Sequence, residues 1–134
     1  MATSILRDIT REYVDLDFSF ARHPISSAVS VKRRLNAVKQ SILHLMRLKS
    51  GDKLFHPEIK SPLYDFLFET TNPIIGVVIE NEVFRYLSVY EPRAIISSVI
   101  VTFPSINAMS CVVVGTIINV QEEFTVNVLV DRLR

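Results

Sequence analysis

The apolar positions between residues 31 and 49 repeat with the period of a helix. Five apolar residues are separated by alternating steps of four and three, which places them on one stripe: Val31, Leu35, Val38, Ile42 and Leu45. The polar residues among them are expected to face solvent: Lys32, Arg33, Asn36, Lys39 and Gln40. Ser30 is a candidate N-cap and Gly51 a candidate C-terminal stop.

Two further helices are predicted after a loop over residues 50–62, which contains a glycine and two prolines. The segment "LYDFLFE" (63–69) is a short helix with Leu63, Phe66 and Leu67 on one side. Residues 72–90 form a longer helix, with Asn72 as its cap and a proline in its first turn. Pro92 ends that helix, because a residue before proline is pushed out of the helical region.

The period then changes to two, which predicts strands at 94–103, 109–120 and 123–130. The connections are short, "PSINA" and a Gln121-Glu122 turn, so neighbouring strands are expected to be antiparallel. The last strand alternates, and one of its faces carries four apolar residues: Phe124, Val126, Val128 and Val130. The middle strand is apolar on both faces.

These elements predict an α+β fold, with about three helices packed on one face of a three-stranded antiparallel sheet. We expect a single domain over 1–134: an extended N-terminal arm (1–29), a helical part (30–92) and the sheet (93–134). The second face of the middle strand then has no evident cover, and the sheet has two edges with free N–H and C=O groups. We infer that a partner completes this sheet.

Composition limits the class of protein. About half of the 134 residues are apolar (49%), yet no uncharged apolar run approaches the ~20 residues of a membrane span. Residues 1–8 lack the pattern of a signal peptide, so we expect a protein made and used without export, and no membrane partner. The single cysteine, Cys111, excludes an internal disulfide framework.

Charge is distributed unevenly, although the net charge is only +1. Residues 18–51 contain no acid, and their basic side chains are Arg22, Lys32, Arg33, Arg34, Lys39, Arg47 and Lys49. The stretch "VKRRLNAVK" suits a phosphate backbone, but it has no interleaved aromatic residues. A solvated face or a protein contact is therefore favoured over nucleic acid.

No residue pattern points to catalysis. Glu58, Asp65 and Glu69 are carboxylates of the kind that a glycosidase pairs across a cleft, but they are more typical of solvated or capping groups, and the chain has no tryptophan platform. The three histidines lack metal-binding spacing, and Cys111 lies in an apolar strand without a nearby base. We predict no catalytic residue, no metal and no cofactor.

The segment "YEPR" joins the helical part to the sheet and carries two opposite charges. Because residues i and i+2 of an extended segment point to the same side, Glu91 and Arg93 should emerge together beside Pro92. One interpretation is an exposed ion pair worth under ~1 kcal/mol. The other is a rigid docking tip whose guanidinium binds carboxylates or carbonyls of another chain. The residues alone leave both open.

Several motifs occur together in a recognisable order: "GDKLFHPEI" (51–59), "LYDFLFE" (63–69) and "YEPR" before a β-rich tail. In this order the chain resembles the baseplate wedge family of contractile-tailed phages, the gene twenty-five product-like sheath initiators that were historically labelled lysozymes and that have a counterpart in type VI secretion baseplates. The similarity runs from about residue 31 to 103 and weakly beyond. Two positions depart from the family: Lys60 replaces a usual glycine, and Leu54 replaces the proline before Phe55.

The resemblance implies a structural role in the baseplate. Glu91, Pro92 and Arg93 would be the signature tip that docks on the helical core bundle of the other wedge proteins. The sheet, including Phe124, Val126, Val128 and Val130, would share strands with the tail sheath protein and so initiate the sheath. Tail tube or hub-proximal proteins are further partners, and the location would be the virion, after assembly in the host cytoplasm. The alternatives are a peptidoglycan-degrading, lysozyme-like enzyme and the equivalent subunit of a type VI secretion baseplate.

Overall fold

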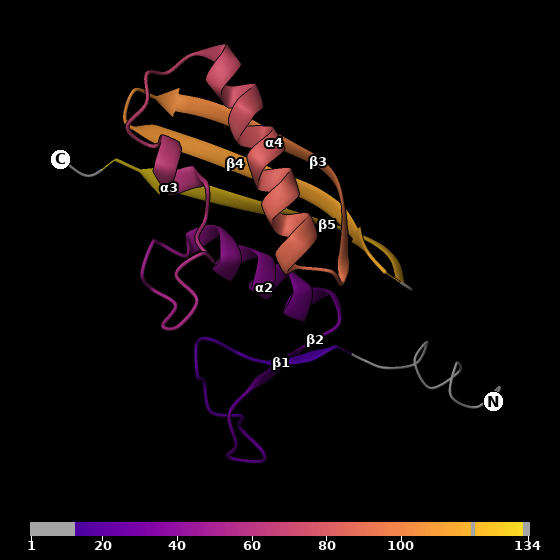
Figure 1. Cartoon of the computed structure of the whole chain (residues 1–134). Helices are drawn as coiled ribbons and strands as arrows, with labels where there is room; N and C mark the ends of the chain where they lie inside the picture. Colours follow the sequence, from indigo (N-terminus) through magenta and orange to yellow (C-terminus); the bar gives the residue numbers. More distant parts are fainter. Residues whose placement is uncertain (1–12, 119, 133–134) are drawn as a thin grey trace.

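The computed structural model describes residues 13–118 and 120–132, and over these residues the predicted α+β class is confirmed. In this described part of the chain, three helices accompany two antiparallel sheets (Figure 1). The elements follow in chain order: β1 (Val14–Leu16), β2 (Val31–Arg33), α2 (Leu35–Arg47), α3 (Leu63–Phe66), α4 (Pro73–Tyr90), β3 (Ala94–Ser105), β4 (Ala108–Ile117) and β5 (Val120–Asp131).

The larger sheet has the order β3-β4-β5, with both pairs antiparallel as predicted. Val113 at its centre lies between Val99 and Val126. β3 and β5 are longer than the sequence suggests, whereas β4 ends at Ile117 rather than at residue 120. Gln121 and Glu122 were predicted to form a turn, but they lie within β5, because a register shift after Thr116 lets Ile117 pair with Val120. Residue 119, between these strands, lies outside the described residues.

The helices lie on one face of this sheet, where α4 packs on β3 and α2 packs on β5 (Figure 1). The core between the two layers includes fully buried side chains from both: Val38, Ile42, Met46, Ile79, Val83, Leu87, Cys111, Val113 and Val128. On the other face no described segment covers the sheet, and its apolar side chains are partly or largely exposed: Ile95, Ile100, Val112, Val114 and Leu129.

α4 forms as its sequence predicts. The Asn72 side chain accepts a hydrogen bond from the Ile74 N–H at 3.0 Å, which satisfies one of the free donors of the first turn. Pro73 occupies that turn at no cost, and Glu91 is the C-cap. The Tyr86 hydroxyl donates to the Leu45 carbonyl at 3.1 Å and so joins α4 to α2.

The first helix is shorter than predicted. Residues 31–33 are not its first turn but strand β2, which pairs antiparallel with β1, so Ser30 is not the cap. The cap position is Arg34, with a positive φ of 50°, and the helix ends at Arg47, before Gly51. Pairing with β1 satisfies the backbone of the β-branched Val31, a long-range gain that the helical period of the sequence does not contain.

The predicted arm is a β-hairpin over the residues that are described. Beyond the β1–β2 pair, an isolated bridge joins Arg22 to Val29. The hairpin lies on the side of α2 away from the sheet (Figure 1), and several of its apolar side chains are exposed. Residues 1–12 of the arm lie outside the described residues. No described helix is both long and apolar enough to span a bilayer.

Candidate functional site

The turn that connects α4 to β3 buries the carboxylate of Glu91. The Glu91 N–H still donates to the Leu87 carbonyl at 2.8 Å, while its own carbonyl accepts from Ala94 at 3.2 Å. Its side chain is turned inward and is only 2% exposed. Pro92, at the tip of the turn, is exposed. The turn therefore presents a proline to solvent and hides one of the two charges.

Arg93 closes over Glu91 as a bidentate partner. Its Nε donates to Glu91 Oε1 at 2.7 Å, and its Nη2 donates to Glu91 Oε2 at 2.9 Å. Its Nη1 donates to Asp15 Oδ2 at 3.1 Å, and the Tyr13 ring lies 5.6 Å from Cζ. The guanidinium thus joins the start of the large sheet to the N-terminal hairpin.

The pKa values of this pair favour the charged forms. Burial alone would raise the pKa of Glu91, but hydrogen bonds from Arg93 and Ser41, together with the charge of Arg93, outweigh burial and lower it. The pKa of Arg93 is raised above its ordinary value, chiefly by its hydrogen bond to Glu91. The pair is therefore a structural ion pair at neutral pH.

This geometry corrects the expectation that Glu91 and Arg93 emerge together from the surface. Glu91 lies inside the molecule, and the Arg93 side chain is 25% exposed. The bonds to Glu91 and Asp15 use three of the five guanidinium N–H groups, and the other two have no acceptor among the residues that the structure describes. The turn therefore exposes Pro92 and part of the Arg93 side chain.

The four apolar residues predicted on β5 point into the core. Phe124, Val126, Val128 and Val130 are 1%, 7%, 0% and 5% exposed, because their face of the strand packs against the helices. Their side chains are therefore not a surface. Of these four residues only the backbone is available at the edge of the sheet, since β5 is an edge strand whose described residues pair with β4 alone.

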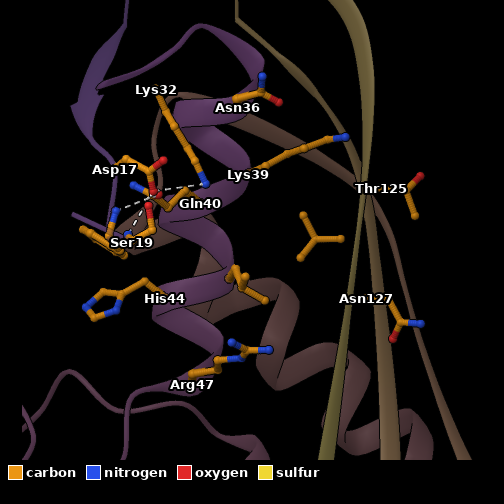
Figure 2. A pocket seen from close by; sticks show the side chains of 13 residues that line it. Asp17, Ser19, Lys32, Asn36, Lys39, Gln40, His44, Arg47, Thr125 and Asn127 are labelled. Atoms are coloured by element: carbon orange, nitrogen blue, oxygen red, sulfur yellow. Dashed lines mark hydrogen bonds and ion pairs between the residues drawn. The ribbon is translucent and has the colours of Figure 1, made fainter. Parts of the chain in front are cut away.

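The two edges of the sheet differ. On β3 the Glu80 carboxylate accepts a hydrogen bond from the Val101 N–H at 2.9 Å, so α4 caps part of that edge. The β5 edge instead borders a groove of about 670 Å³ between the hairpin, α2 and the strand. Thr125 and Asn127 of β5 line it (Figure 2).

The α2 side of this groove is basic. Asn36, Lys39, Leu43 and Arg47 follow one another at helical spacing along it, and Figure 2 shows Lys39 reaching from α2 towards β5. Over the described residues no ion pair involves Lys39 or Arg47. Among the described residues that line the groove, the one carboxylate is that of Asp17, which lies 3.6 Å from the Lys32 ammonium group.

Gln40 ties the hairpin to α2, a role that sequence reasoning missed. It was predicted to face solvent, but it is buried: its Nε2 donates to the Leu16 carbonyl at 2.7 Å, and its Oε1 accepts from the Phe18 N–H at 3.2 Å. An amide that both donates and accepts suits an unpaired strand backbone. No local signal marks this role, because the partners lie 24 and 22 residues away in sequence.

Comparison with known proteins gives one curated relative, the baseplate wedge protein gp25 of Enterobacteria phage T4, which is 28% identical over 88 residues. The alignment covers 66% of this chain and 66% of gp25. No protein-family model matches the chain. The predicted resemblance to baseplate wedge proteins is confirmed.

Two solved structures share the fold of this gp25-like chain. A Geobacter sulfurreducens protein described as a tail lysozyme has a TM-score of 0.65 at 19% identity, covering 72% of this chain and 89% of its own. A chain of the anti-feeding prophage (AFP) baseplate has a TM-score of 0.63 at 18% identity, covering 97% of this chain and 92% of its own. At these identities the likeness concerns the fold alone.

A lysozyme cleaves its substrate with a pair of carboxylates, and three carboxylates of this chain were considered for that role from the sequence: Glu58, Asp65 and Glu69. Glu58 lies 3.0 Å from the His56 ring and Asp65 lies 2.8 Å from Lys60, both on the exposed surface. Glu69 lines a separate, very small hollow. The large groove contains none of the three. A glycosidase needs two carboxylates about 5–10 Å apart across a cleft, and neither the large groove nor the small hollow is lined by two of these three.

The other side chains that could carry chemistry are the cysteine and the histidines. Burial, and next the charge of Glu80, raise the pKa of the Cys111 thiol to about 12, so it stays protonated in the core. Among the described residues no three His, Cys, Asp or Glu side chains are grouped as metal ligands would be. His23 receives backbone N–H bonds in the hairpin, and the His44 ring packs edge-on against Phe18.

Proposed function

We propose that this chain is a structural, non-enzymatic component of the baseplate wedge of a contractile tail. The relationship to gp25 and the fold shared with an AFP baseplate chain support the coarse role. Sheath initiation by strand addition is supported by the asymmetry of the sheet. The β3 edge is partly capped by Glu80, whereas the β5 edge borders an open groove. A free edge is a template for a strand of another chain.

In this proposal the sheath initiates at β5. An extended segment of a tail sheath subunit adds to the β5 edge through main-chain hydrogen bonds, so Phe124, Val126, Val128 and Val130 contribute their backbone rather than their side chains. The new strand also extends the uncovered sheet face. Sheath initiation follows because the first ring of sheath subunits acquires a fixed register on a preformed sheet.

The strand-sharing proposal is tested by disulfide trapping with cysteine-substituted sheath termini. Asn127→Cys lies on β5 beside the groove, and Thr102→Cys is the matched control on β3; both side chains are exposed. We expect a mixed disulfide with sheath subunits from position 127 and none from position 102. Trapping at position 102 with none at 127 would place the sheath strand on the other edge and refute the proposal.

The second contact is the turn at Glu91, Pro92 and Arg93, which docks on the helical bundle of the other wedge proteins. Pro92 supplies a rigid exposed surface, and the two unused N–H groups of Arg93 meet carbonyls or a carboxylate of the bundle. Glu91 acts through Arg93 by holding the guanidinium plane in place. Tail tube or hub-proximal proteins would lie beyond this bundle, and nucleic acid and membrane have no part in the proposal.

Docking is tested by co-expressing the chain with the wedge proteins of the same particle and measuring co-purification. Pro92→Glu alters only an exposed tip, and Arg93→Lys keeps the charge while losing the bidentate fork. We expect both to reduce co-purification at least ~10-fold, since each removes a central contact. Arg85→Lys, on an exposed face of α4, is the control and should bind normally. Wild-type yields from both test variants would refute docking through the turn.

The same surfaces would serve a phage virion or a particle such as AFP, and in either case the protein would be part of the assembled baseplate. The alternative of a peptidoglycan-degrading enzyme is tested by a cell-wall turbidity assay on the purified chain. The proposal expects no clearing above buffer. Clearing that disappears in Glu58→Gln or Glu69→Gln would refute the non-enzymatic role.

A further inference from the structure

The groove beside β5 carries a charge pattern that the proposed function does not use. Lys39 and Arg47, which form no ion pair with any described residue, lie on α2 with Leu43 between them and the β5 edge opposite. The groove's one lining carboxylate, Asp17, already contacts Lys32, and the backbone N–H of Ser19 lowers the pKa of Asp17. A segment bound in the groove would therefore contact the free backbone N–H and C=O groups of the β5 edge on one side and the two cations of α2 on the other.

We infer that the groove selects an acidic extended segment of a partner protein, with two carboxylates four residues apart on the side that faces α2. This inference rests on the proposed strand addition at β5 and specifies the chemistry of the strand. Nucleic acid is the less favoured occupant, because a phosphate backbone would satisfy the cations but could not continue the hydrogen-bond ladder of β5.

The spacing follows from the two elements that line the groove. Lys39 and Arg47 are eight residues apart on α2, a separation of about 12 Å along a helix axis. Side chains i and i+4 of a strand lie on the same face and are about 13 Å apart. In Figure 2, α2 and β5 run lengthwise on the two sides of the groove, so an added strand would pass both cations in turn. The side chain midway, at i+2, would face Leu43 and should be apolar.

The test uses three labelled synthetic peptides with a Val/Thr-rich strand sequence and Leu at i+2. They carry Glu, Gln or Lys at both i and i+4. Binding to the full chain is followed by fluorescence anisotropy at low and high salt, and binding at β5 by amide hydrogen exchange of residues 123–131. The groove variant is Lys39→Gln/Arg47→Gln. The matched control, Lys53→Gln/Arg85→Gln, removes the same two residue types from outside the groove.

We expect the Glu peptide to bind about 10-fold more tightly than the Gln peptide at ~50 mM salt, and the Lys peptide to bind weakest. The preference should shrink to about 2-fold at ~500 mM salt. It should vanish in the groove variant, persist in the control, and coincide with slowed exchange in β5.

Four other outcomes would contradict charge selection by the groove, strand addition at β5, or both. Equal binding of all three peptides with protection of β5 would leave strand addition standing and overturn charge selection. Preference for Glu that survives in the groove variant would also overturn it. Absence of binding by every peptide would refute both the inference and a receptive β5 edge. Tighter binding of a labelled DNA 20-mer than of the Glu peptide, lost in the groove variant, would assign the cations to phosphate instead.

Discussion

Replacing Arg93 by alanine tests the ion pair on which the architecture of the turn depends. The substitution removes both hydrogen bonds to Glu91 and the bond to Asp15, and leaves a carboxylate that is 2% exposed with Ser41 as its remaining side-chain donor. An exposed ion pair, one of the two interpretations that the sequence allowed, would be worth under ~1 kcal/mol. The buried position of Glu91 predicts instead a clear loss of stability.

The size of the loss follows from the burial of the two partners. Removing one partner of a buried ion pair costs about 3–5 kcal/mol. Arg93 is 25% exposed, so water can reach part of the vacated space, and we expect about 2–3 kcal/mol. For a chain of this length that corresponds to a fall in Tm of roughly 6–12 °C.

The assay is urea unfolding at about pH 7, followed by circular dichroism, for wild type, Arg93→Ala, Arg85→Ala and the double variant Glu91→Gln/Arg93→Ala. Arg85 forms only an exposed i,i+3 pair, so its loss should change the free energy of unfolding by under ~0.5 kcal/mol. The double variant should be more stable than Arg93→Ala, because an amide costs less to bury unpaired than a carboxylate does. A free energy for Arg93→Ala within ~0.5 kcal/mol of wild type would refute the reasoning.

Three further predictions follow from other contacts. The pKa of Glu91 lies below its ordinary value of 4.5, so its contribution to stability is present above about pH 4.5 and is lost as pH falls through the folded-state pKa. Urea midpoints should therefore fall more steeply below pH 4.5 in wild type than in Glu91→Gln, and parallel curves would contradict this. Gly115→Ala should cost about 1–3 kcal/mol in urea unfolding, because the new Cβ would lie 2.5 Å from the Ile95 carbonyl oxygen; Ser110→Ala on the same strand is the control, and equal stability would show that the strands can separate freely. Gln40→Ala removes both of its bonds to the hairpin, so amides of residues 14–18 should exchange at least ~5-fold faster while β4 stays protected. Unchanged exchange would show that other contacts, such as Arg93 with Asp15 and His44 with Phe18, are sufficient to hold the hairpin.

The sequence by itself determined the parts of the fold that rest on local rules. Asn72 caps α4 because its own side chain reaches the first turn, and Pro92 ends the helix through its own ring. The alternation of β5 placed Phe124, Val126, Val128 and Val130 on one face, as a strand with one buried face requires a period of two. That this face is the buried one and not a partner surface was decided by the packing of the helices. Short connections were sufficient to predict the antiparallel order β3-β4-β5.

Only the tertiary structure decided the features that join distant segments. Val31 fits a helix by its spacing and lies in a strand because β1 pairs with it. Gln40 fits an exposed helix face and is buried because the hairpin needs its amide. Arg93 meets Asp15 across 78 residues of sequence. Such contacts depend on where two chain segments lie after folding. Their free energy is shared between residues far apart in the sequence, and no local pattern at either residue indicates the other.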